Sequence, residues 1–145
     1  MSTMTFTVPG RARGQGSKRH IGRGTMIEAS RHVKQWRAEV AAAAAAAATE
    51  QDWPKHTTTP CAVMISVVRA RPNTHYIGRD PARGLRDTAP VSCTSTPDVD
   101  KVARAVLDAL TQAGVWDDDR RVDMLAVSRD WGVEDSTSVT VWDQP

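Results

Sequence analysis

Six aspartates fall between residues 98 and 119, a stretch that holds only two basic residues. The first 37 residues have the opposite balance, with eight bases and one acid. An empty cluster of acids is costly, because two carboxylates about 4 Å apart repel by roughly 4 kcal/mol at an effective dielectric near 20. A divalent cation resolves this conflict, since carboxylate oxygens hold Mg²⁺ and the ion bridges to phosphate. The two stretches together predict a metal site beside a bound polyanion.

The acidic stretch is predicted to form a helix. Thr96 or Asp98 could cap its start, and a glycine follows its last turn. Apolar residues recur at helical spacing on one face, while Asp100, Arg104 and Asp108 are spaced four apart on the other. Taken alone, such a ladder of charges is typical of a solvated helix face and requires no function.

The spacing of three carboxylates restricts how they can share one ion. Residues two apart on a helix point about 200° from each other, so Asp98 and Asp100 cannot both face one ion from inside a regular helix. They can do so if Asp98 lies in the extended entry and Asp100 in the first turn. We expect Asp119 to be brought to them by the turn that leads into the next strand.

The segment 10–24 combines five glycines with five bases, which predicts a flexible cationic segment that lies along a phosphate backbone. Its residues do not follow the order of a nucleotide-binding P-loop. A disordered basic loop explains the same composition and is compatible with nucleic-acid binding. A second basic contact is expected in the long loop at 71–95. The predicted DNA-binding residues are Arg11, Arg13, Lys18, Arg19, Arg23 and Arg71.

The remaining patterns predict an α+β fold with a mixed sheet and two main helices, in one domain spanning residues 1–145. Alternating or β-branched residues predict strands at 4–8, 61–69, 121–129 and 137–142, and an alanine-rich helix precedes the second strand. The strand at 61–69 is expected to be central and buried on both faces. The last two strands are expected to form a hairpin, in the overall order β-α-β-α-β-β.

Composition excludes several classes of protein. Cys61 and Cys93 stand apart from each other and from any histidine at ligand spacing, which indicates reduced thiols without a zinc site. No apolar run is long enough to span a membrane, and no secretion signal is present. We therefore expect a cytoplasmic protein that works on DNA without a membrane partner.

The ordered residues of the acidic stretch resemble the RusA-type Holliday-junction resolvases. The signature of that family is roughly D-x-D-N-x-x-K-x-x-x-D-x-L, then a glycine, then an Asp-Asp pair before a strand. Here it reads as Asp98-Val99-Asp100-Lys101, Arg104, Asp108-Ala109-Leu110, Gly114 and Asp118-Asp119. The resemblance extends over nearly the whole chain, and its specificity lies in residues 97–122.

The resemblance implies a Mg²⁺-dependent endonuclease, with Mn²⁺ as a substitute, that acts as a homodimer on four-way DNA junctions in recombination and repair. Asp98, Asp100 and Asp119 would be its metal-binding catalytic carboxylates. Two positions depart from the pattern, since the family's Asn is Lys101 and its catalytic Lys is Arg104. Arginine keeps its charge and is a poor proton donor, so either cation could stabilise charge on the scissile phosphate.

Two other functions fit the same residues. A nuclease that cuts forks, flaps or other branched DNA would use the same site. A junction-binding protein without catalysis would use the same basic segments, and its aspartates would serve as helix caps and solvated surface.

Overall fold

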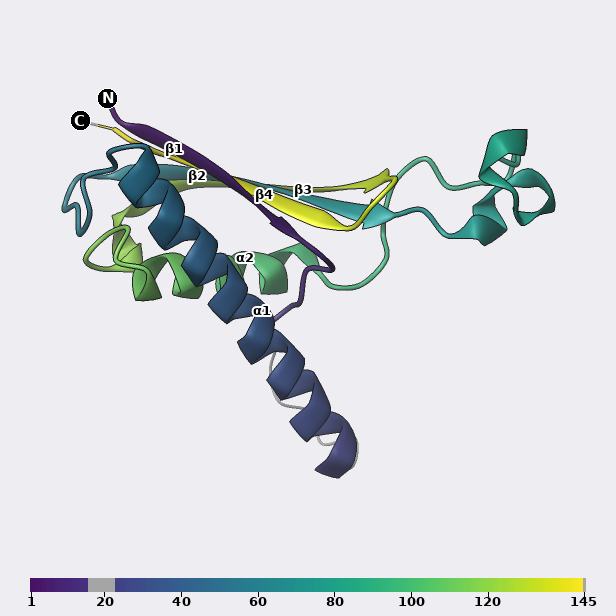
Figure 1. Cartoon of the computed structure of the whole chain (residues 1–145), viewed down its shortest axis with the longest axis horizontal. Coiled ribbons are helices and arrows are strands. Elements are labelled where there is room, and N and C mark those ends of the chain that lie inside the picture. Colours follow the sequence, from purple (N-terminus) through teal and green to yellow (C-terminus); the bar gives the residue numbers. More distant parts are fainter. Residues whose placement is uncertain (16–22, 145) are drawn as a thin grey trace.

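The structure is a computed structural model that describes the backbone of residues 1–15 and 23–144, and the side chains of these residues other than 23–30. Its centre is a four-stranded sheet in the order β1-β4-β2-β3 (Figure 1). The strands are β1 (Thr3–Pro9), β2 (Cys61–Ala70), β3 (Val122–Gly132) and β4 (Ser136–Asp143). β4 runs antiparallel to both of its neighbours, and β2 and β3 are parallel. The predicted α+β class, the mixed sheet and the order of elements are confirmed.

The prediction of a hairpin between the last two strands is wrong, because β3 and β4 lie on opposite sides of β2. Their connection crosses the end of β2, where the Asp135 carboxylate accepts a hydrogen bond from Ala70 N at 2.8 Å. On the other side, Arg71 N donates to Gly132 O at 3.0 Å. Alternation predicts a strand without naming its neighbour. Here the parallel pair β2–β3 is joined through a crossover helix, which places β3 beside β2.

Both helices cover the same face of the sheet (Figure 1). They are α1 (Arg23–Glu50) and α2 (Val99–Gln112). The alanine run of α1 presents a smooth surface that lets α2 and the sheet approach closely. The α1 residues buried in this way are Trp36, Val40, Ala41, Ala44, Ala47 and Ala48.

The predicted apolar face of α2 is largely confirmed. Val102, Val106 and Leu110 are buried in the core, whereas Val99 remains 37% exposed. The prediction that β2 is buried on both faces is wrong. Its first three residues are buried, but from Val63 to Val68 buried and accessible positions alternate, and Met64 is 47% exposed. One layer of helices is enough to bury only one face of the sheet.

Residues 71–92 leave the sheet after β2 and form a projection that we call the arm (Figure 1). It contains three short 3₁₀ turns, at Asn73–His75, Ile77–Arg79 and Pro81–Arg83. The chain then returns to the body and enters α2. The predicted long loop is therefore an ordered segment that contains its own short helical turns.

Candidate metal and nucleic-acid site

The entry of α2 holds two exposed carboxylates that do not cap the helix. Asp98 occupies the N-cap position with extended backbone, at φ −63° and ψ 142°, and its side chain makes no capping hydrogen bond. Asp100 lies in the first turn, and both residues are exposed. Lys101 Nζ is 3.5 Å from Asp98 Oδ2. The predicted placement of Asp98 in the extended entry and Asp100 in the first turn is confirmed.

The end of the N-terminal basic segment lies directly against this entry. Gln15 N donates a hydrogen bond to Lys101 O at 3.0 Å. A Cβ at Gly14 would lie 2.9 Å from the Lys101 Cβ, so only glycine permits this close approach. Arg11 reaches the hydroxyl of Thr96 at 3.4 Å. The packing thus brings the first arginines of the basic segment beside Asp98 and Asp100.

The side chain of Gln15 joins the two helices through this segment. Its Nε2 donates to Asp108 Oδ2 at 2.7 Å, and its Oε1 accepts from the Arg37 guanidinium at 2.9 Å. Asp108 therefore has a structural partner, whereas Arg104, one turn earlier on α2, is exposed. The predicted charge ladder of Asp100, Arg104 and Asp108 is therefore not uniform, because Asp108 is hydrogen-bonded to Gln15 while the other two are exposed.

Two arginines at the ends of β2 and β3 hold the segment that precedes Asp98. Arg69 Nε donates to Ser95 Oγ at 3.3 Å, and its guanidinium lies 3.7 Å from the Asp135 carboxylate. Arg129 donates to two backbone carbonyls, those of Cys93 and Pro97. Sequence reasoning missed both residues. The available signal was one arginine near the end of each strand, Arg69 in β2 and Arg129 in β3.

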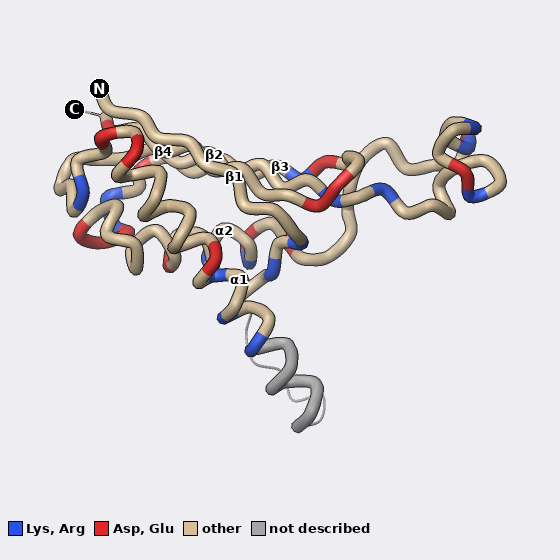
Figure 2. The backbone as a smooth tube through the Cα atoms, viewed as in Figure 1, with Lys and Arg blue, Asp and Glu red and all other residues tan. Residues whose placement is uncertain are grey.

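We call the basic residues around the entry of α2 the basic end; Figure 2 shows blue backbone segments in this region, with red segments beside them. Its members are Arg11, Arg13, Arg69, Arg71, Lys101 and Arg129. Desolvation, followed by repulsion from Arg69 and Arg13, lowers the pKa of Arg11. Arginines that lie close enough to repel one another are suited to binding an anion such as phosphate.

The acidic corner, Asp117 to Asp119, follows the other end of α2, and two of its three aspartates have structural tasks. Asp117 accepts two hydrogen bonds from Arg121, each of 2.7 Å. Hydrogen bonding to Arg121 is the main cause that lowers the pKa of Asp117. Asp118 accepts from Arg120 N at 2.9 Å and so caps the 3₁₀ turn at Asp119–Arg121. Asp119 is exposed, and within the described parts of the chain its side chain makes no hydrogen bond.

The three predicted metal ligands do not meet within one chain. Asp98 and Asp100 lie at the start of α2, and Asp119 lies beyond its end, across a 14-residue helix that is about 20 Å long. Across residues 1–15 and 23–144, no group of three His, Cys, Asp or Glu side chains could hold a metal ion. The expected delivery of Asp119 fails because β3 begins beside the far end of α2.

The predicted DNA-binding residues are described only in part. Arg11 and Arg13 lie at the basic end, and Arg71 stands at the root of the arm, where its guanidinium donates to Pro90 O at 2.8 Å. Lys18 and Arg19 lie outside the described residues. Arg23 begins α1, and its side chain also lies outside them.

Comparison with known proteins places this arrangement in a family. A family model described as endodeoxyribonuclease RusA matches residues 9–142. No curated protein matches the chain. In the portion of the chain that is described, no helix is long and apolar enough to cross a membrane. The match covers nearly the full length, including both ends of α2 and the segment that packs on its entry, so the chain belongs to the endodeoxyribonuclease RusA family.

Proposed function

We propose that this protein is a Mg²⁺-dependent endonuclease that resolves four-way DNA junctions by hydrolysing phosphodiester bonds. Family membership supplies the nuclease activity. The observation that carries the rest is the entry of α2, where Asp98 and Asp100 are exposed, without capping bonds, and surrounded by the arginines of the basic end. A carboxylate pair left uncommitted among cations suits a bound metal ion next to DNA.

The residues at this entry fit Mg²⁺. The ion prefers oxygen ligands and is often held by one or two carboxylates together with substrate phosphate. Asp98 and Asp100 supply two such carboxylates, both exposed, and Asp98 pairs with Lys101 at the helix surface. When bound, the ion would activate the attacking water and neutralise charge on the phosphate.

The protein's own cations have separate tasks in this proposal. Lys101 and Arg104 project from α2 near the carboxylates and would stabilise negative charge that develops on the phosphoryl oxygens. Arg11, which is exposed, and Arg13, which is half-buried, would hold the flanking DNA backbone, because they belong to a segment that is itself fixed against Lys101. Neither role requires base recognition, which agrees with an enzyme selective for DNA shape.

The third carboxylate would come from a second subunit. Within the described residues, β2 is the one strand that pairs with β3, so β3 is an edge strand, and it carries Met124 at 44% and Leu125 at 41% exposure. An exposed edge strand with apolar side chains is a template for pairing with another chain. Two β3 strands paired antiparallel about a twofold axis would set the two α2 helices antiparallel. Asp119 of one subunit would then approach Asp98 and Asp100 of the other.

Charge supports this homodimer. One end of α2 is flanked by the basic end, and the other leads into the acidic corner. An antiparallel pair of α2 helices places unlike ends together, whereas a parallel pair places like charges together. The proposed dimer therefore completes the carboxylate set and also reduces repulsion.

The experiment is cleavage of a panel of DNA substrates with and without Mg²⁺, namely a four-way junction, a fork, a flap and a linear duplex. We expect paired, symmetric cuts in the four-way junction and none without the ion. Asp100→Asn should bind the junction as the wild type does but lose cleavage at least 100-fold. Normal cutting by this variant would contradict the site, and preferred cutting of forks or flaps would contradict the substrate.

A further inference from the structure

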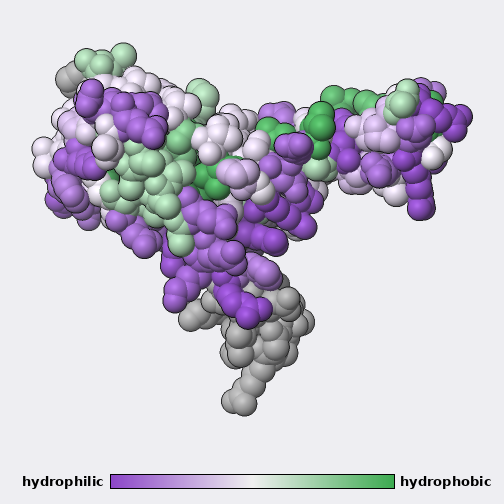
Figure 3. All heavy atoms as spheres, viewed as in Figure 1, coloured by the Kyte–Doolittle hydropathy of each residue, from purple (hydrophilic) through white to green (hydrophobic). Residues whose placement is uncertain are grey.

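Beyond its root, the arm packs against no other element among the described residues, and its order comes from bonds within it. Two limbs pair around Tyr76 and Leu85, with Ile77 N donating to Gly84 O at 3.0 Å. Arg86 N also donates to His75 O at 2.9 Å. Yet Ile77 and Leu85 remain 40% and 47% exposed, and the arm stands clear of the sheet and helices (Figure 3). Its order therefore comes from internal bonds, and its surface is available to a partner.

The root of the arm is fixed to the sheet beside the basic end. The Arg71 guanidinium lies 5.3 Å from the centroid of the Trp131 ring, and His75 meets the same ring edge-on at 5.1 Å. The returning limb runs from Ser92 through residues 93–97, which Arg129 holds, to Asp98. The arm thus leaves the body at the same place as the candidate metal ligands.

The far part of the arm presents arginines whose positions are set by its backbone. The Arg83 guanidinium packs against Gly78 so closely that a Cβ there would lie 2.4 Å from Arg83 Nη1. Arg86 Nε donates to Tyr76 O at 3.0 Å. Arg79, the residue after Gly78, is exposed, and its own backbone φ is +58°. Among the acidic residues of the arm, Asp80 accepts a hydrogen bond from Ala82 N and so has a structural role.

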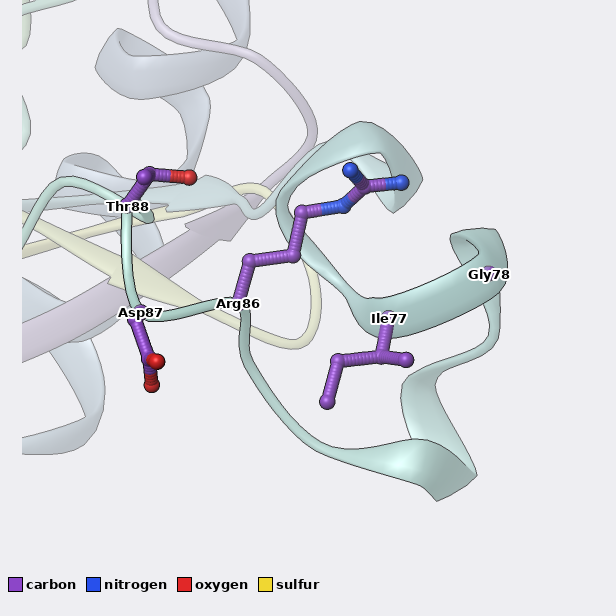
Figure 4. Close-up of a pocket in the computed structure, with 5 residues that line it drawn as sticks. All are labelled: Ile77, Gly78, Arg86, Asp87 and Thr88. Carbon is purple, nitrogen blue, oxygen red and sulfur yellow. The ribbon is translucent and has the colours of Figure 1, made fainter.

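A hollow of about 340 Å³ lies between the two limbs (Figure 4). Ile77 projects into it, the Arg86 side chain forms another side, and the Asp87 carboxylate points away from the Arg86 guanidinium. An apolar side chain beside a fixed cation suits a sugar–phosphate backbone, which offers a sugar face and an anionic phosphate.

We propose that the arm is a second DNA-binding element, which grips the phosphate backbone of a duplex arm set back from the scissile bond. The inference rests on the proposed function, since it takes branched DNA as the substrate. Arg79 and Arg83 make the contacts, and Arg86 shapes the hollow between the limbs. The arm and the basic end together hold one substrate at two separate places.

The test measures binding of a fluorescent four-way junction by anisotropy, with metal chelated, across a series of salt concentrations. We expect Arg79→Ala combined with Arg83→Ala to weaken binding on the order of tenfold, and to reduce the slope of log affinity against log salt by roughly two. Arg79→Lys should retain most of the affinity, because a phosphate contact requires mainly charge. Lys55→Ala, matched to Arg79→Ala and placed at the opposite end of the molecule, should bind like the wild type.

Unchanged affinity and slope in the double variant, with an unchanged melting temperature, would overturn the proposal. So would a change in oligomeric mass by light scattering with DNA binding intact, because the arm would then contact a second subunit. Because binding is measured without metal, the outcome does not depend on cleavage. Loss of the metal-site assignment would leave the arm result standing, and the reverse also holds.

Discussion

The two ends of α2 carry aspartates in similar number but in different states. At the entry, Asp98 and Asp100 are exposed and make no capping bond, while arginines surround them. At the exit, Asp117 and Asp118 are bound to Arg121 and to a backbone amide, and only Asp119 is uncommitted. The difference separates carboxylates that accept hydrogen bonds within the fold from those that remain exposed, and the proposed metal site uses the exposed ones.

Near the two ends of α2, the pKa values of two distant groups, Arg11 and Cys61, are shifted. At the basic end, neighbouring arginines help to lower the pKa of Arg11. Near the acidic corner, burial raises the pKa of Cys61 to about 11, and the charges of Asp143 and Asp123 add to this shift. In both groups desolvation is the largest cause, and the neighbouring charges add to it, positive around Arg11 and negative around Cys61. The predictions below test whether these ends differ in function as they do in charge.

The largest effect is expected within the acidic corner itself. Asp119→Asn should lower the cleavage rate at least 100-fold while leaving the melting temperature unchanged, because its carboxylate makes no bond within the described chain. Asp117→Asn should lower the melting temperature slightly and leave the cleavage rate of the folded enzyme within about threefold. Single-turnover cleavage and thermal denaturation measure both. Equal losses of cleavage in the two variants would show that the corner acts as a unit.

Arg129→Ala should have the next largest effect, at the basic end. It removes the donor to the carbonyls of Cys93 and Pro97, which costs about 2 kcal/mol in unfolding free energy and loosens the segment before Asp98. The Mg²⁺ concentration for half-maximal cleavage should rise severalfold. Chemical denaturation and a Mg²⁺ titration measure the two effects. A stability loss with an unchanged Mg²⁺ requirement would limit Arg129 to a structural role.

A smaller effect is expected from Arg11→Ala combined with Arg13→Ala. These residues would contact phosphates, so the salt dependence of junction binding should flatten by roughly two in the slope of log affinity against log salt. Cleavage at saturating protein should change little. An unchanged slope would remove this pair from the DNA interface.

The smallest effect concerns Cys61 and stability at high pH. The folded protein keeps the thiol proton up to about pH 11, while the unfolded chain releases it near 9.0. The unfolded state thus binds fewer protons, so stability that is present below pH 9 is lost as the pH rises toward 11, by up to about 2 kcal/mol. Urea denaturation across this range should show the loss. Cys61→Ala should remove that part of the pH dependence, and an identical pH profile in the variant would contradict it.

The sequence predicted the elements well because their signals are local. The apolar period of α2, the alanine run of α1 and the alternation of the strands each specify a structure within a few residues. The positions of Asp98 and Asp100 at the helix entry were predictable for the same reason, since entry and first turn are set by local backbone geometry.

Relations between distant elements were not predictable in this way. The pairing of β4 with β1 and β2, and the separation of Asp119 from Asp98, depend on which strand lies next to β2 and in which direction it runs. Arg69 and Arg129 acquire their roles only when two strand ends meet the segment before α2. Three carboxylates that a motif groups along the chain can therefore lie at two ends of a helix.

Mixing two inactive variants tests most directly whether the carboxylate set forms across two subunits. Asp100→Asn and Asp119→Asn, refolded together, should yield dimers with one intact site and restore nicking of one junction strand. Asp98→Asn mixed with Asp100→Asn should remain inactive, because both changes lie at the same end of α2. If native mass spectrometry shows mixed dimers of the first pair and cleavage is still absent, the shared site is contradicted.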